Sequence, residues 1–265
     1  MSIPSKAAAK DALIRLVRLS HTALLPLDGC RACGEWRKDG WELGFRMTCV
    51  SVVGKIVAHY RVSGEARDLA IQLLDSYLRG GARGGVGKSA ELISTVAVAV
   101  STKLLTHRHI KYKDFPQLRA KEAVAFETVF LSAVDLSLIT PELTPSSLVH
   151  TIALGLQLWL KPTTIELIVR ALWATVSSFF ATPLTMAFTV IETLVPKSKL
   201  KAVFEKLGIS LASLASTNNT CRKHLRAVAV QTLYPVDLPP LQPTICGAGG
   251  ARKRKRNILL MERQI

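Results

Sequence analysis

The run from Glu91 to Leu105 is apolar around its whole circumference when it is drawn as a helix. Its side chains are hydrophobic, small or hydroxylic between the charges of Glu91 and Lys103. A helix of this kind is usually surrounded by other elements, whereas a surface helix keeps one polar face. The run therefore predicts a buried helix at the centre of a helical bundle.

Three neighbouring segments have a one-sided apolar pattern instead. Within residues 47–60, 70–78 and 126–134 the apolar side chains recur every three or four positions, which places them on one face of a helix. One fully apolar helix beside three one-faced helices predicts a bundle with the apolar helix in the middle. The positions are Met47, Val50, Val53, Val57 and Tyr60, then Ala70, Leu73, Leu74, Tyr77 and Leu78, then Phe126, Val129, Phe130, Ala133 and Val134.

A second group of helices is expected over residues 142–234. Threonine precedes proline at Pro141, Pro145 and Pro183, which is typical of helix starts because threonine caps the end and proline suits the first turn. The expected helices span 147–159, 163–180, 183–194, 198–207 and 210–230, the last interrupted near Asn218 and Asn219.

Two stretches resemble the conserved box of the cyclins, a five-helix bundle around one buried helix. Residues 59–78, HYRVSGEARDLAIQLLDSYL, are similar to the family pattern EYxLxxETxxLAxxxxDRFL, and the central run ending at Lys103 is similar to its AxxLxASK helix. Residues 180–187 are similar to YxPSxxAxA in the second cyclin box. The resemblance covers residues 40–230 and implies an all-α fold of two tandem five-helix cyclin-like bundles.

Five positions anchor the first cyclin box, and each has the matching residue type here. The resemblance implies that Arg46 and Asp75 form a buried pair, whose breakage would cost about 3–5 kcal/mol. It implies that Leu92 belongs to the box core and that Lys103 and Glu127 face a kinase. The alternative for Lys103 and Glu127 is a surface ion pair worth less than about 1 kcal/mol.

Cyclins also recruit substrates through an apolar patch beside the arginine. The matching positions are Phe45, Cys49 and Val52, where Val52 replaces the tryptophan of the family. Leu104 and Leu105 replace the acids that follow the lysine in many cellular cyclins, a feature closer to short viral cyclins.

The resemblance therefore implies a regulatory subunit that forms a heterodimer with a cyclin-dependent serine/threonine kinase, activates it and promotes cell-cycle progression. No nucleophile elbow, carboxylate pair or metalloprotease helix is visible, which favours a non-enzyme with no cofactor or small-molecule substrate. Cys30 and Cys33 have the spacing of half a zinc site, but without a matching second pair they are interpreted as free thiols.

The net charge of +16 supports an alternative from another class. A basic all-helical protein could coat nucleic acid or an anionic membrane, as a viral matrix protein does. Part of this charge lies in Arg252, Lys253, Arg254, Lys255 and Arg256, which follow a stretch rich in proline and glycine. That run is typical of a segment bound by a nuclear import receptor, so we expect the chain in the nucleus and the cytoplasm.

Two further segments have features of other functions. Residues 171–191 carry no charge, but Ser177, Ser178 and Pro183 favour two helices with a break before Pro183 over a membrane span. Residues 79–89 end like a phosphate-binding loop, yet the preceding segment is helical rather than a strand, which favours a glycine linker.

The expected organisation thus has four parts. Residues 1–40 hold an amphipathic helix and a connecting loop, residues 41–140 the first cyclin box, residues 141–234 the second bundle and residues 235–265 a flexible basic tail.

Overall fold

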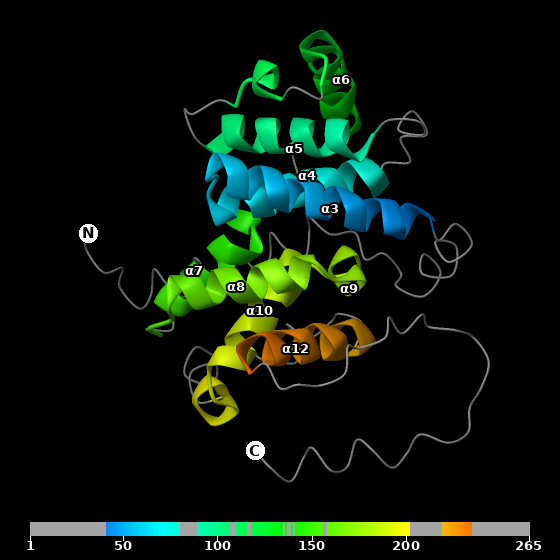
Figure 1. Cartoon of the computed structure of the whole chain (residues 1–265). Coiled ribbons are helices and arrows are strands. Elements are labelled where there is room, and N and C mark those ends of the chain that lie inside the picture. The colour runs from blue at the N-terminus through cyan, green and yellow to red at the C-terminus, as the bar shows by residue number, and fades with distance from the viewer. Residues whose placement is uncertain are drawn as a thin grey trace, which may run out of the picture. The chain divides into compact units, whose positions relative to one another are not determined.

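The computed structural model describes residues 41–79, 89–105, 110–115, 118–134, 136, 139, 141–155, 158–201 and 219–234. Within these residues every element is an α-helix or a 3-10 helix, and none is a strand (Figure 1). The prediction of an all-α fold is therefore confirmed. The chain divides into two units, Met1–Tyr234 and Pro235–Ile265, and all described residues belong to the first. The expected N-terminal helix, the Cys30–Cys33 pair and the basic run 252–256 lie outside the described residues.

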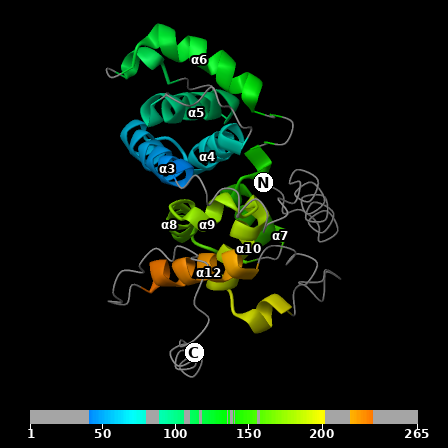
Figure 2. The ribbon, with the colours of Figure 1, turned by 90° about the vertical axis from the view of Figure 1, so that its right-hand side faces the viewer.

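The first helix set surrounds α5. Figure 2 shows α5 between α6 on one side and the pair α3 and α4 on the other. Every side chain from Leu92 to Thr102 is buried, so the prediction of an enclosed central helix is confirmed. The set comprises α3 (Trp41–Tyr60), α4 (Gly64–Arg79), α5 (Ala90–Leu105), η2 (Tyr112–Asp114) and α6 (Ala120–Ala133).

The hydroxyls of Ser94, Ser101 and Thr102 in α5 are compatible with this burial because they donate to backbone carbonyls, whereas the buried Thr95 Oγ1 has no hydrogen-bond partner. Ser94 Oγ donates to Cys49 O at 3.0 Å, across to α3, and Thr102 Oγ1 donates to Ala99 O at 2.9 Å within the helix. At the start of α5, Ser89 Oγ accepts from Leu92 N at 3.1 Å, as expected of a capping residue. Buried hydroxyls with such partners carry little desolvation penalty.

The faces of the flanking helices agree with the sequence prediction at most positions, and two positions show its limits. Val50 and Val53 of α3 are buried as expected, together with Cys49, Ile56 and Arg46, whereas Val57 is half-buried and packs against the core. On α6, Val129 is exposed although its spacing placed it on the packed face. The reason is that periodicity marks which positions are apolar but does not show which neighbour covers them.

The helix α4 is buried on nearly all sides rather than on one. It contacts α5 in the first helix set and α7 in the second, and its buried residues include Arg67, Asp68 and Asp75. The charged residues in its sequence suggested a solvent face. Three of them are buried with partners, because Arg67 and Asp68 pair with each other and with the second set, and Asp75 pairs with Arg46 of α3.

The second helix set is arranged around α10, which contacts α7, α8 and α12. Residues 163–180, expected as one helix, form two, because Thr175 Oγ1 donates to Leu172 O at 2.7 Å and caps α9. The predicted break before Pro183 is confirmed, since Thr182 Oγ1 accepts from Thr185 N at 3.0 Å. The set comprises η4 (Pro141–Leu143), α7 (Pro145–Gly155), α8 (Pro162–Trp173), α9 (Val176–Phe179), α10 (Pro183–Leu194), a short helical stretch at 197–201 and α12 (Asn219–Leu233).

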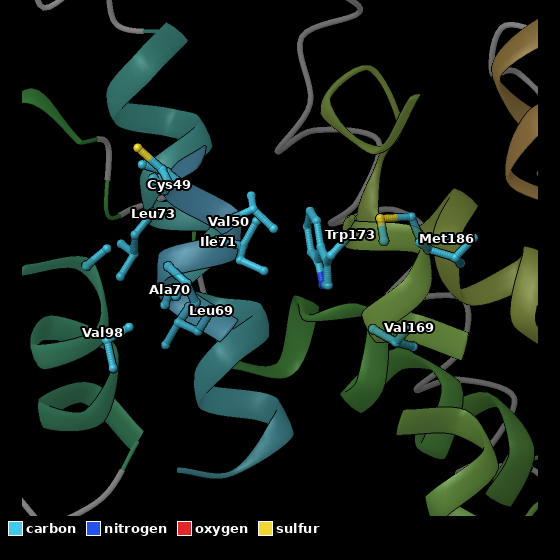
Figure 3. Packing of buried hydrophobic residues seen from close by; sticks show 14 of the residues in the cluster. Cys49, Val50, Leu69, Ala70, Ile71, Leu73, Val98, Val169, Trp173 and Met186 are labelled. Atoms are coloured by element: carbon cyan, nitrogen blue, oxygen red, sulfur yellow. The ribbon is translucent and has the colours of Figure 1, made fainter. Parts of the chain in front are cut away.

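A tryptophan joins the cores of the two helix sets. Figure 3 shows Trp173 of α8 between Ile71 and Val50 of the first set and Met186 and Val169 of the second. The apolar core is therefore continuous between the sets. Across the described residues, no helix combines the length and apolar composition needed to span a bilayer.

Candidate partner-binding site

Lys103 and Glu127 lie side by side at the surface of the first helix set. Lys103 occupies the last turn of α5, and Glu127 lies in the middle of α6. The lysine Nζ donates to both carboxylate oxygens, at 2.6 Å to Oε1 and 2.7 Å to Oε2. A two-point contact of this kind fixes both charged groups in one direction more firmly than a single hydrogen bond does.

Tyr112 contacts both members of this pair. Its hydroxyl donates to Glu127 Oε2 at 2.5 Å, and Lys103 Nζ lies 5.6 Å from the centre of its ring. Burial raises the pKa of Tyr112, and the hydrogen bond to Glu127 raises it further, so the phenol remains a donor at neutral pH. The carboxylate of Glu127 is thus held between an ammonium and a phenol.

The segment from Ile110 to Phe115 packs inward at its aromatic residues, although Lys111 and Lys113 are exposed. Tyr112 and Phe115 are buried, and Tyr60 OH donates to Asp114 O at 3.0 Å. The Tyr60 and Phe115 rings lie 5.1 Å apart. Tyr112 and Phe115 are three positions apart, and this spacing indicates that one side of η2 packs inward. The basic residues beside them favoured an exposed segment instead.

Exposed apolar side chains accompany the charged pair. Leu104 follows Lys103 directly, and Val124 lies one helical turn before Glu127, with 58% of its surface exposed. A partner that covers the charged pair would therefore also bury apolar surface of Leu104 and Val124.

Arg46 and Asp75 form a buried two-point ion pair. Arg46 Nε donates to Asp75 Oδ1 at 2.8 Å and Nη2 to Oδ2 at 2.9 Å, and the arginine is 1% exposed. The same guanidinium donates to Ser178 Oγ at 3.0 Å and to Thr175 O at 3.3 Å. The pair therefore joins α3 and α4 to each other and both of them to α9.

A second buried network was not identified from the sequence. Asp68 accepts from Arg67 Nη2 at 2.6 Å, from Ser146 Oγ at 2.5 Å and from Trp173 Nε1 at 3.0 Å. Arg67 also pairs with Glu166. Burial raises the pKa of Asp68, and the donors around it offset part of that shift. The sequence of α4 also contains Glu65, Asp75 and Arg79, so nothing local distinguished Arg67 and Asp68 from surface charges.

The substrate-docking patch expected at Phe45, Cys49 and Val52 does not form one exposed surface. Cys49 is fully buried because it lies on the face of α3 that packs on α5, while Phe45 and Val52 are half-buried. Burial also raises the pKa of Cys49 to about 12. Leu92, which the resemblance places in the box core, is buried in the apolar core of the first helix set.

Within the described ranges, no cluster of histidine, cysteine, aspartate and glutamate has the arrangement needed to hold a metal ion. No protein-family model matches the sequence, and no curated protein matches it significantly. The function is therefore inferred from the residues and their geometry.

Proposed function

We propose that this chain is a cyclin-like regulatory subunit, built from two tandem cyclin-like bundles, that binds and activates a cyclin-dependent serine/threonine kinase and so promotes cell-cycle progression. The observation that carries the proposal is the Lys103–Glu127 pair at the exposed end of an enclosed helix. These residues stand at the positions where the cyclin resemblance implies contact with the kinase.

The mechanism follows from what such kinases require. Their activity depends on a lysine–glutamate ion pair, which a mobile helix completes, and on a magnesium-binding aspartate. A subunit that binds only the active position of that helix shifts the equilibrium by its difference in affinity for the two states. The subunit thereby activates the kinase without taking part in the chemistry.

The rigidity of the site supports this role. Glu127 is already held by Lys103 and Tyr112, so little side-chain freedom is lost when a partner binds. Arg46 and Asp75 fix α3 against α4, the two helices on which α5 packs. The charged pair is therefore presented by a preorganised support.

Charge reversal tests the proposal. We expect Lys103→Glu and Glu127→Lys each to reduce retention of cyclin-dependent kinase at least tenfold, because removing one partner of a desolvated charged interaction at an interface costs about 2–5 kcal/mol. The measurement is a pull-down from dividing cells with the full chain as bait, followed by a kinase assay. Lys223→Glu is the matched control, since Lys223 is exposed on α12 in the second helix set.

A combined Lys103→Glu and Glu127→Lys chain separates folding from binding. The reversed pair can still form between α5 and α6, so we expect native helix content with kinase binding still reduced. Equal retention by wild-type chain and both single variants, or no kinase with wild-type chain, would contradict the proposal.

Net charge supports a second candidate, a structural protein that binds nucleic acid or anionic membrane. The described part of 141–234 contains the acids Glu142, Glu166 and Glu192, of which Glu166 pairs with Arg67 and Glu192 with Arg222. The cations there are Lys161, Arg170, Lys197, Lys199, Lys201, Arg222, Lys223 and Arg226. This candidate predicts RNA or lipid in the same pull-down, with binding that weakens steeply as salt rises.

For localisation, we propose that Arg252–Arg256, outside the described residues, bind an import receptor and direct the chain to the nucleus.

A further inference from the structure

The connection between α7 and α8 carries the most exposed large apolar side chain in the described part of the chain. The relative exposed area of Trp159 is 101%, and that of Leu154, at the end of α7, is 59%. Tryptophan is on average a highly buried residue, since it is the largest apolar surface a chain can remove from water. An indole held entirely in solvent needs a physical explanation.

The neighbouring residues hold Trp159 outward. Leu158 and Leu160 are half-buried and pack against the apolar core, so the side chain between them points away from it. Leu158 N donates to Ala153 O at 2.8 Å, which ties the connection to the end of α7. Trp159 is therefore presented by a backbone that is anchored on both sides.

The charge nearest to this projection along the chain is positive. Between Glu142 and Glu166 the sequence contains no acidic residue, while Lys161 is exposed two positions after Trp159. Glu166 is itself paired with Arg67 of α4. An exposed apolar side chain and an exposed cation therefore stand together at this connection.

We propose that this α7–α8 tip, consisting of Leu154 and Leu158–Lys161, docks the chain onto an anionic lipid surface. Tryptophan is favoured at the boundary between headgroups and acyl chains, and the exposed Leu154 enters the apolar side of that boundary. Lys161 then contacts the headgroups, and the net charge of +16 attracts the chain to the surface.

An anionic membrane fits the tip better than nucleic acid does. An indole can stack on a base, but the aliphatic side chain of Leu154 gains nothing from a phosphate backbone. The binding is peripheral, and it is separate from the Lys103–Glu127 pair, which belongs to the first helix set. The inference therefore does not depend on the proposed kinase-binding role.

Vesicle flotation of the full chain tests the inference. We expect binding to phosphatidylcholine vesicles that contain phosphatidylserine, and about tenfold weaker binding for Trp159→Ser, because the variant no longer buries a large apolar side chain. Lys161→Ala should weaken binding about fivefold on the anionic vesicles only. Val230→Ser, at an exposed apolar position of α12, is the matched control and should bind as the wild-type chain does.

A second readout locates the indole itself. Trp159→Phe should keep most of the vesicle binding, while quenching of tryptophan fluorescence by brominated lipid should fall sharply relative to the wild-type chain. Three results would each overturn the inference: no vesicle binding by the wild-type chain, equal binding by wild-type chain and Trp159→Ser, or quenching that persists in Trp159→Phe. Trp159-dependent binding to an RNA oligonucleotide without vesicle binding would assign the tip to nucleic acid instead.

Discussion

Cys49 lies on the buried face of α3, where its thiol is removed from water. Burial raises its pKa to about 12, from an ordinary value near 9.0. Above that ordinary value the thiol of the unfolded chain releases its proton, whereas the thiol of the folded chain retains it. Fewer protons are then bound in the unfolded state, so the contribution of Cys49 to the free energy of unfolding falls as pH rises from about 9 to about 12.

Cys49→Ala should remove this pH dependence. The variant loses packing at every pH, but its disadvantage relative to the wild-type chain should shrink by up to about 1.4 kcal/mol per pH unit above the ordinary thiol pKa. Urea unfolding of both chains at neutral and alkaline pH measures the difference, and titration of lysines and tyrosines affects both chains alike. A difference that stays constant with pH would contradict the assignment.

The residues of the candidate site were predictable to different degrees. Lys103 and Glu127 were selected through the cyclin resemblance, because neither composition nor periodicity distinguishes them from other surface charges. Tyr112 was missed, since its contact with Glu127 joins two elements and no local pattern marks it. Asp68 was missed for the same reason, because its donors Ser146 and Trp173 are remote in sequence.

At the scale of elements, the start of α10 shows how local sequence sets a boundary. Thr182 accepts from Thr185 N at 3.0 Å, and Pro183 occupies the first helical turn. We expect Thr182→Ala to lower the free energy of unfolding by about 1 kcal/mol, because a helix donor loses its partner.

Thr128→Ala is the matched control for this substitution. Thr128 is exposed in the interior of α6, where alanine is the better helix former, so the change should be neutral or slightly stabilising. Thermal unfolding of both variants measures the effect. Equal stabilities for the two variants would show that the Thr182 cap contributes nothing.

The presence of each helix was easier to predict than which of its faces is buried. Apolar spacing identified α3, α4 and α6, but Val129 is exposed and α4 is covered on nearly all sides. A helix face becomes buried only where another element packs on it, and that element can be distant in sequence. The expected helix over 163–180 was divided because Thr175 makes capping contacts that spacing does not reveal.

At the scale of the whole molecule, Asp68 joins the two helix sets. Its carboxylate accepts from Arg67 of α4, Ser146 of α7 and Trp173 of α8. We expect Asp68→Ala to lower the free energy of unfolding by about 3–5 kcal/mol, because it leaves a buried guanidinium without its main partner. Since the hydrogen bonds from Ser146 and Trp173 join the sets, the second set should unfold before α5 does in this variant.

Calorimetry and hydrogen exchange measure this loss of cooperativity. Glu166→Ala is the control, because it also removes a partner of Arg67. The Glu166 side chain is 46% exposed, so its ion pair with Arg67 should contribute about 1 kcal/mol or less to the free energy of unfolding. A single transition near the wild-type temperature for Asp68→Ala would show that the hydrogen bonds of Asp68 do not couple the sets.

The sequence by itself determined the all-α class, the enclosed helix from Leu92 to Thr102 and the break before Pro183. Each of these follows from interactions among residues close in the chain, through helical periodicity and capping. Only the tertiary structure decided that Tyr112 supports Glu127, that Cys49 is buried and that Asp68 joins three helices. Those features depend on which surfaces of distant segments meet, and an interaction between remote residues leaves no periodic trace in the sequence.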